Sequence, residues 1–164
     1  AIFARFQLCL NHRKLGHSAF ALLSAIFKYL PFELYRQHFP AVLAAACENL
    51  RARKAPDLEK EFVLALSVFA HTADPSMLLA AFEQIQPGGF GNFLTQVWLP
   101  GAKSVMLLQR RKVCIFGLVR LMPQLDSNEL LSACCEGLAG LIRWRGSGLM
   151  AWLSSILPLR PSEE

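Results

Sequence analysis

Residues 85–91, "IQPGGFG", interrupt a sequence whose surroundings have the apolar spacing of helices. One proline and three glycines fall within five residues, which is typical of a phosphate-binding loop or of a joint between helices. A P-loop follows a strand and carries Lys and Ser or Thr directly after its glycines, so that N–H groups and an ammonium converge on phosphate. Here a helical pattern precedes, and Phe90 and Asn92 stand where those groups are needed. The stretch therefore predicts a joint.

The expected joint consists of Pro87, Gly88, Gly89, Phe90 and Gly91. Glycine adopts a positive φ without steric cost, so either Gly88 or Gly89 is expected to turn the backbone there. Phe90 is expected to insert between the helices and to fix the position of the next one.

Residues that start or stop helices divide the rest of the chain. Asp74 and Pro75 in "ADPSMLL" are typical of an N-cap and of a first helical position. Asp126 and Glu129 in "DSNEL" lie three residues apart and resemble a capping box. Helices are expected to end at Pro31, at Pro100 with Gly101, and at Pro123.

The apolar residues between these positions repeat at helical spacing, and no stretch alternates with the period of a strand. Pro40 predicts a kink or a late start in the third helix. The expected helices cover residues 1–12, 16–30 and 33–53, segments opened by "APDLEKEF" and "ADPSMLL", the segment after the joint, residues 107–122, a segment opened by "DSNEL", and a short last helix through Leu157.

The helix pairs recur at an interval close to that of known helical repeats. Pairs begin near Gly16, Asp57 and Gln109, and HEAT-type repeats have a period of ~40–47 residues. The second unit is longer because the glycine break splits its second helix. We therefore expect an all-α fold: a HEAT-repeat-like, right-handed α-solenoid of about three helix hairpins plus flanking helices. It is expected to form one domain over residues 1–157 with a polar tail at 158–164. Helical hairpins of another kind would leave a similar pattern.

Composition limits the classes of protein. The chain has 164 residues, of which 54% are hydrophobic, and five cysteines without a CxxC pair. Buried free thiols are expected rather than disulfides or a zinc site. The best candidate for a membrane span, residues 62–82, contains Asp74 and Pro75 and is expected to form two helices and a turn. The chain begins without Met on apolar residues, so we expect a fragment of a longer protein.

No group of residues has the spacing of a catalytic or metal site. His12, His17, His38 and His71 are scattered, and no Cys or Glu lies at ligand spacing from them. The sequence also lacks GxSxG, HExxH and a paired acid motif in an apolar setting. We expect no enzyme activity, no metal and no cofactor.

Basic residues cluster in "LRARK", "QRRK" and "RWR", each at a helix end or an inter-helix turn. The net charge of +5 is compatible with nucleic acid. Aromatic interleaving is limited to Trp144, however, and cations at helix C-termini are ordinary partners of the helix dipole. These cations are therefore expected chiefly to be solvated helix ends. As a binding surface, they favour an acidic protein partner over nucleic acid, and the candidate contacts are Arg110, Arg111 and Lys112.

Longer segments resemble a known family. Phe82, Ile85, Gln86, Pro87, Phe90 and Gly91 match the Phe-x-x-Ile-Gln-Pro-x-x-Phe-Gly segment of the cellular apoptosis susceptibility (CAS, or CSE) exportins, in the C-terminal region. "FALLSAIFKYLPFELYRQHF", "EKEFVLALSVFA" and "RRKVCIFGLVRLM" resemble that family in the same order. The resemblance covers roughly residues 5–125.

The resemblance implies a HEAT-repeat superhelix of the importin-beta superfamily, present here as a C-terminal fragment. It also implies a parent that binds importin-alpha with GTP-bound Ran, shuttles between nucleus and cytoplasm, and leaves GTP hydrolysis to Ran. Two alternatives remain: a helical-repeat scaffold of unrelated role, including nucleic-acid binding, and a regulatory helical domain of an enzyme. If repeats precede residues 1–12, these should expose an apolar patch, because each repeat buries its face on a neighbour.

Overall fold

The computed structural model describes residues 2–12 and 14–143, and every regular element in them is helical. The α-helices are α1 (Ile2–Asn11), α2 (Gly16–Tyr29), α3 (Phe39–Arg53), α4 (Pro56–Thr72), α5 (Pro75–Ile85), α6 (Gly89–Phe93), α7 (Leu99–Ser104), α8 (Leu108–Leu121) and α9 (Asn128–Ile142). Short 3-10 helices are η1 (Phe32–Leu34), η2 (Arg36–His38) and η4 (Met122–Gln124), and η3 (Leu94–Trp98) is a π-helical turn. The expected last helix through Leu157 and the tail at 158–164 lie outside the described residues.

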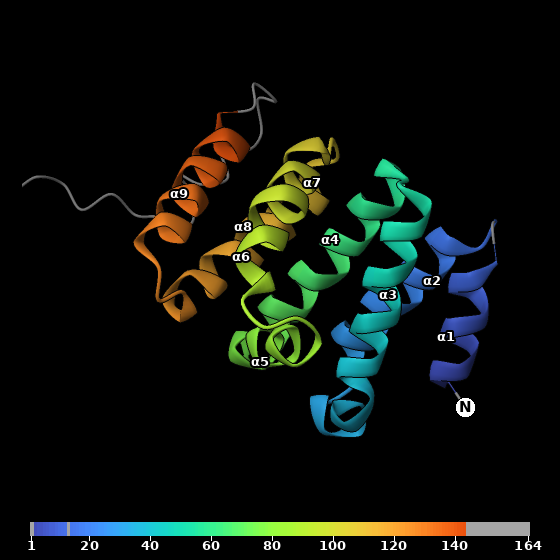
Figure 1. The fold of residues 1–164 in the computed structure, drawn as a ribbon. Helices are drawn as coiled ribbons and strands as arrows, with labels where there is room; N and C mark the ends of the chain where they lie inside the picture. Colours follow the sequence, from blue (N-terminus) through green and yellow to red (C-terminus); the bar gives the residue numbers. More distant parts are fainter. Residues whose placement is uncertain (1, 13, 144–164) are drawn as a thin grey trace, which may run out of the picture.

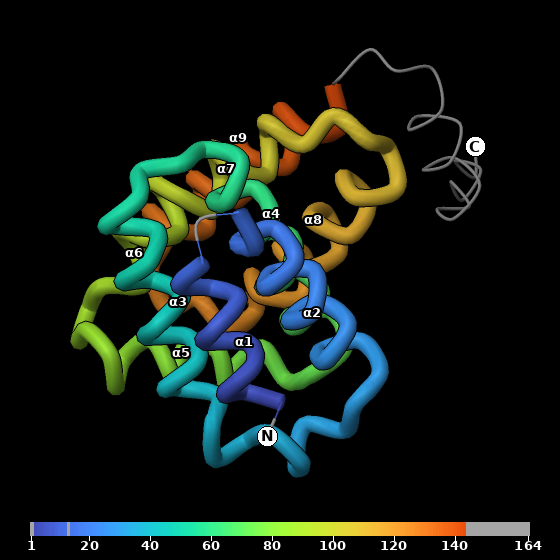
Figure 2. The backbone as a smooth tube through the Cα atoms, turned by 90° about the vertical axis from the view of Figure 1, so that its right-hand side faces the viewer, coloured from blue at the N-terminus to red at the C-terminus, as the bar shows by residue number. Residues whose placement is uncertain are grey.

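The helices form two layers of a helical-repeat solenoid that runs from α1 to α9 (Figure 1). In one layer α4 lies between α2 and α8 and packs on both. In the other, α1 packs on α3 and α7 packs on α9, while α5 contacts both α3 and α6. Seen from the α1 end, α3 and α6 lie on one side and α2 and α8 on the other (Figure 2). The expected all-α repeat fold is confirmed.

The predicted repeat interval corresponds to one of these layers. The starts expected near Gly16, Asp57 and Gln109 fall within a residue of the starts of α2, α4 and α8. These three helices stack on one another because α4 buries apolar residues along both sides, among them Phe62, Leu66 and Phe69. Equivalent helices therefore occupy equivalent positions, although the second repeat is longer than the first because α5, α6, η3 and α7 lie between α4 and α8.

Close packing of α4 on α8 depends on a glycine. A Cβ at Gly117 in α8 would lie 2.7 Å from the Cα and 2.8 Å from the carbonyl oxygen of Ser67 in α4. Atoms of the α4 backbone cannot rotate away as a side chain can, so only glycine permits this distance between the helices.

The joint at residues 87–91 has the predicted geometry. Gly88 has a φ of 68°, and the Glu83 carboxylate accepts a hydrogen bond from its N–H at 3.1 Å. Phe90 is 7% exposed and its ring lies edge-on to Phe82 and to Trp98. The glycine turns the chain between α5 and α6, and the phenylalanine fixes α6 against the core.

The expected helix end at Pro100 is wrong. The helix continues through Pro100 as α7, because the preceding residues form the wider π-turn η3, in which the Leu99 N–H donates to the Leu94 carbonyl. A proline lacks the N–H and crowds the carbonyl four residues earlier, and a wider turn relieves that crowding. Gly101 does not end the helix; a Cβ there would lie 2.9 Å from Val63 Cγ2 of α4.

Other helix starts agree with the sequence or differ by a residue. Asp74 caps α5, its Oδ1 accepting from the Ser76 N–H at 2.9 Å, as predicted. The cap of α9 is Ser127 rather than Asp126, because its hydroxyl accepts from the Leu130 N–H. Pro40 lies in the first turn of α3, after two 3-10 turns, which confirms the late start.

Two further expectations concern apolar segments. The stretch from residue 62 to 82 forms two helices, and no helix among the described residues is long and apolar enough to cross a bilayer. In α1, Phe6 and Leu10 are buried within the chain, whereas Leu8 is 72% and Ile2 42% exposed. The expected N-terminal apolar patch is therefore reduced to these two exposed side chains.

Candidate functional site

The predicted cationic cluster begins α8, but its three members have different environments. Arg110 is exposed and its Nη1 pairs with the Glu61 carboxylate of α4. Lys112 is half-buried. Arg111 is 2% exposed, and burial lowers the pKa of its guanidinium, which stays charged in proteins.

Arg111 is bound inside the protein by backbone oxygens. Its Nε donates to the Val105 carbonyl and its Nη2 to the Lys103 carbonyl, each at 3.0 Å. Its Nη1 donates to the Leu141 carbonyl at 3.4 Å. These carbonyls come from the end of α7, the following loop and the end of α9, so one side chain joins the ends of two helices to α8.

The prediction that Arg111 contacts a partner is therefore wrong for this structure, because its guanidinium lies in the interior. Arg110 and Lys112 stay candidate contacts. The sequence contains the relevant pattern: Arg111 is followed by Cys114, Ile115 and Leu118 at i+3, i+4 and i+7, and all three are buried. The helical spacing thus indicates a buried position for Arg111, whereas the run of three cations favoured an exposed one.

The basic residues of "LRARK" also have structural roles. Arg53 Nη2 donates to the Asn11 carbonyl at 2.9 Å and so satisfies the end of α1. Lys54 ends α3 with a left-handed φ of 46°. Arg51 extends away from α3, and its Nη2 donates to the Gln86 Oε1 at 2.6 Å. Arg143 follows α9, and the rest of "RWR" lies outside the described residues.

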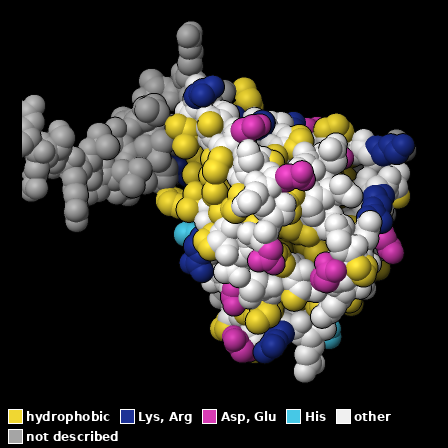
Figure 3. All heavy atoms as spheres, turned by 60° about the vertical axis from the view of Figure 1, so that its left-hand side comes forward, with side chains coloured by type: hydrophobic (Ala, Val, Ile, Leu, Met, Phe, Trp, Pro, Cys, Tyr) yellow, Lys and Arg dark blue, Asp and Glu magenta, His cyan; other side chains and the backbone are white. Residues whose placement is uncertain are grey.

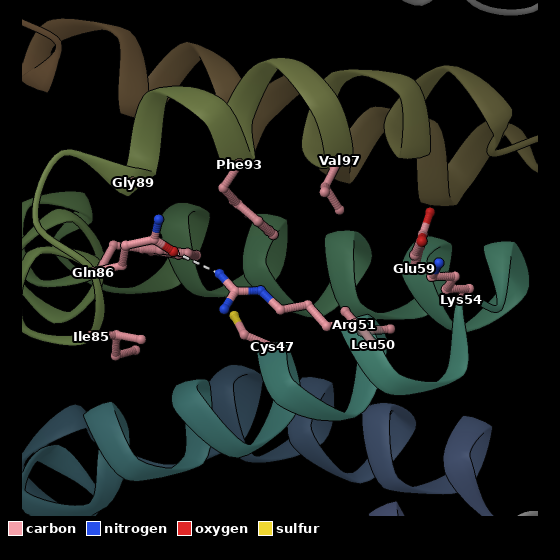
Figure 4. A pocket seen from close by; sticks show the side chains of 11 residues that line it. Cys47, Leu50, Arg51, Lys54, Glu59, Ile85, Gln86, Gly89, Phe93 and Val97 are labelled. Atoms are coloured by element: carbon pink, nitrogen blue, oxygen red, sulfur yellow. Dashed lines mark hydrogen bonds between the residues drawn. The ribbon is translucent and has the colours of Figure 1, made fainter.

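Arg51 lies over an apolar groove of about 390 Å³ between α3 and the α6–η3 segment (Figure 4). The sequence interpretation did not identify it. On the side brought forward in Figure 3, hydrophobic side chains lie at the base of a hollow with charged side chains around it. The groove is lined by Cys47, Leu50, Arg51, Lys54, Glu59, Phe82, Ile85, Gln86, Gly89, Phe93 and Val97.

No nucleophile or metal site emerges from the described residues. No three His, Cys, Asp or Glu side chains among them are grouped so that they could hold a metal ion. The buried thiols of Cys47, Cys114 and Cys134 have pKa values raised to about 11 by burial, so they are protonated near neutral pH. Cys9 is half-buried and Cys135 is exposed, so the expectation of buried thiols is wrong for Cys135.

Comparison with known proteins gives the family. Residues 1–143 match the model described as "CAS/CSE protein, C-terminus". The chain is 22% identical over 119 residues to "Exportin-2" of Danio rerio, covering 73% of this chain. It is 27% identical over 128 residues to "Importin-alpha re-exporter" of Schizosaccharomyces pombe, covering 71% of this chain. The matched part spans 12% of the length of each relative. No solved structure matches the chain.

Proposed function

Since this chain belongs to the CAS/CSE protein family and matches the family's C-terminal part, we propose that it is part of a nuclear export receptor for importin-alpha. The observation that carries the proposal is the family match over residues 1–143, which includes every described helix. The relatives named exportin-2 and importin-alpha re-exporter support it. The parent protein would be a transport receptor and would itself catalyse no reaction.

The resemblance extends the proposal to GTP-bound Ran as a second partner and to shuttling between nucleus and cytoplasm. A solenoid suits such a task because it presents an extended surface built from successive repeats. Arg110 and Lys112 are the proposed contacts with an acidic partner surface. A nucleic-acid role is less well supported, because Arg53 and Arg111 bind backbone carbonyls of the chain itself.

The test uses the intact parent protein, purified importin-alpha, and Ran loaded with a non-hydrolysable GTP analogue. Each partner should tighten binding of the other by the same factor, because coupling between two binding equilibria is reciprocal. Calorimetric titrations in both orders measure the two factors. A parent that binds neither partner, or binds importin-alpha equally well with Ran-GDP and Ran-GTP, would refute the proposal.

The candidate contacts need a separate variant. Arg110→Glu with Lys112→Glu in the parent should weaken ternary assembly more at low than at high salt, because the contribution of an exposed charge such as that of Arg110 is screened by salt. Arg111 is left unchanged, since its replacement would disturb the fold. Arg5→Glu with Lys14→Glu, near the other end of the stack, is the charge-matched control. Equal affinity of the two double variants would exclude Arg110 and Lys112 as contacts.

A further inference from the structure

The groove between α3 and the α6–η3 segment has the form of a docking site for a short helix. Cys47, Leu50, Arg51 and Lys54 on α3 follow one another at i, i+3, i+4 and i+7. Seven residues of helix span about 10 Å, roughly two turns. The groove is therefore elongated along the helices, and Figure 4 shows it running from Gln86 at one end to Lys54 and Glu59 at the other.

The opposite wall has a similar stripe. Gly89, Phe93 and Val97 are spaced by four residues, and in Figure 4 Phe93 and Val97 point from this wall toward α3. Gly89 is buried under the Gln86 side chain, whose Cγ would lie 2.8 Å from a Cβ at this position, so Gln86 closes this end of the groove. Together with Leu50 and Ile85, these residues give an apolar surface that can receive the side chains of an amphipathic helix at i, i+3 or i+4, and i+7.

The groove exists because of the joint. α5 contacts α3 at one side and α6 at the other, so it separates two segments of the same layer. Phe82 and Ile85 of α5 line the groove, while the αL turn at Gly88 carries the chain into α6. An inserted helix of only 11 residues thus keeps the segments apart without covering the surface between them.

Charge indicates the chemistry of the occupant. Arg51 and Lys54 are exposed cations at the groove, against the single carboxylate of Glu59 among the lining residues. The Arg51 guanidinium donates to a neutral amide oxygen, that of Gln86. A carboxylate accepts a charge-assisted, bidentate bond roughly twice as strong as a neutral one, so an acidic ligand would take the guanidinium from Gln86.

We propose that this groove binds an acidic amphipathic helix of a partner protein, with apolar side chains between Leu50, Phe93 and Val97 and a carboxylate on Arg51. The proposal does not depend on whether the parent carries importin-alpha. A small apolar molecule is the competing occupant, and it would make no use of the two cations.

The test starts from a phage library of random peptides of about 12 residues, long enough for three helical turns. The library is selected on the purified chain, with the Val97→Trp chain in solution to remove peptides that bind elsewhere. Recovered peptides should carry apolar residues at helical spacing next to Asp or Glu. No enrichment, or enriched peptides without acidic residues, would overturn the proposal.

Fluorescence anisotropy of the recovered peptides then tests the two cations. Arg51→Gln should weaken binding about tenfold, as expected for loss of a charged hydrogen bond, whereas Arg5→Gln on α1 should leave it unchanged. Val97→Trp should abolish binding because the indole fills the groove. The matched control is Val119→Trp on α8, where the valine is already 49% exposed. Equal effects of Arg51→Gln and Arg5→Gln would overturn the role of Arg51.

Two thiols locate the peptide. Because the Cys47 thiol is buried and protonated near neutral pH, a Val97→Cys variant supplies a reactive thiol in the groove, and Cys135, which is exposed on α9, is the reference. A bound peptide should slow the reaction of the introduced thiol with methyl methanethiosulfonate, measured by peptide mass spectrometry, and leave the reaction of Cys135 unchanged. Protection of neither thiol by a saturating peptide would place the peptide elsewhere and refute the assignment of the groove.

Discussion

Replacing Arg111 by methionine should destabilise the chain strongly, although a run of three cations is usually a tolerant surface. Methionine keeps an unbranched apolar stem in the same space but provides no donor. The carbonyls of Val105 and Leu141 then lose a buried partner, whereas the Lys103 carbonyl is only partly buried and can bind water.

The magnitude follows from the bonds to the two buried carbonyls, those of Val105 and Leu141. A buried acceptor without a donor costs about 1–3 kcal/mol, which gives about 2–6 kcal/mol for the two buried carbonyls. Removing the desolvated guanidinium returns part of this cost, since buried charges are themselves expensive. We therefore expect Arg111→Met to lower the free energy of unfolding by about 3 kcal/mol, within the range of buried hydrogen-bond losses.

Urea denaturation followed by circular dichroism at the helical band measures this loss. Arg110→Met is the control, because its exposed ion pair with Glu61 should contribute at most about 1 kcal/mol. Arg111→Lys retains the charge without the planar fork and should not restore stability. The interpretation of Arg111 as a structural residue is refuted if Arg111→Met costs no more than Arg110→Met.

Three further predictions use the same assay. Gly117→Ala should destabilise the chain, since overpacking against the Ser67 backbone costs about 1–3 kcal/mol and the better helix propensity of alanine returns only about 1 kcal/mol. The control is Gly140→Ala, which meets only the Lys103 side chain and should be neutral or stabilising. Equal effects of the two substitutions would contradict the close packing of α4 on α8. Phe90→Ala should cost about 3–5 kcal/mol, as for a buried phenylalanine, and a near-neutral result would contradict its role at the joint. Asp74→Ala should destabilise the chain above pH 4, because hydrogen bonds from Ser76 lower the pKa of the Asp74 carboxyl in the folded state. This stabilisation is present above the pKa of the unfolded chain and disappears as the pH falls through the pKa of the folded chain. A difference in stability between the two chains that persists unchanged in acid would contradict this role of Asp74.

The sequence predicted those features of the fold that depend on local chemistry. The cap at Asp74, the positive φ at Gly88 and the late start of α3 at Pro40 each follow from the preferences of one or two residues. The layer of α2, α4 and α8 was predictable for a related reason, because a repeated pattern of apolar residues requires a repeated neighbour.

The errors arose where packing across the chain determines the outcome. Pro100 is a helix breaker by local preference, but the π-turn before it and the contact of Gly101 with Val63 keep the helix intact. The groove was not predictable from α3 alone, because a stripe such as Cys47, Leu50 and Lys54 is also compatible with a fully covered helix face. Its exposure depends on where α5 holds the α6–η3 segment.

Arginine shows most clearly why charge alone did not identify a site. A guanidinium bound to helix-end carbonyls, as at Arg53 and Arg111, belongs to the fold, since its acceptors have few alternatives inside the protein. A guanidinium that binds an exposed neutral side chain, as at Arg51, can exchange that partner for a carboxylate at little cost. The partner that each arginine has in the folded chain, which the sequence does not specify, therefore separates structural arginines from those available for recognition. By this criterion the groove under Arg51 is a better candidate for partner binding than the three cations at residues 110–112.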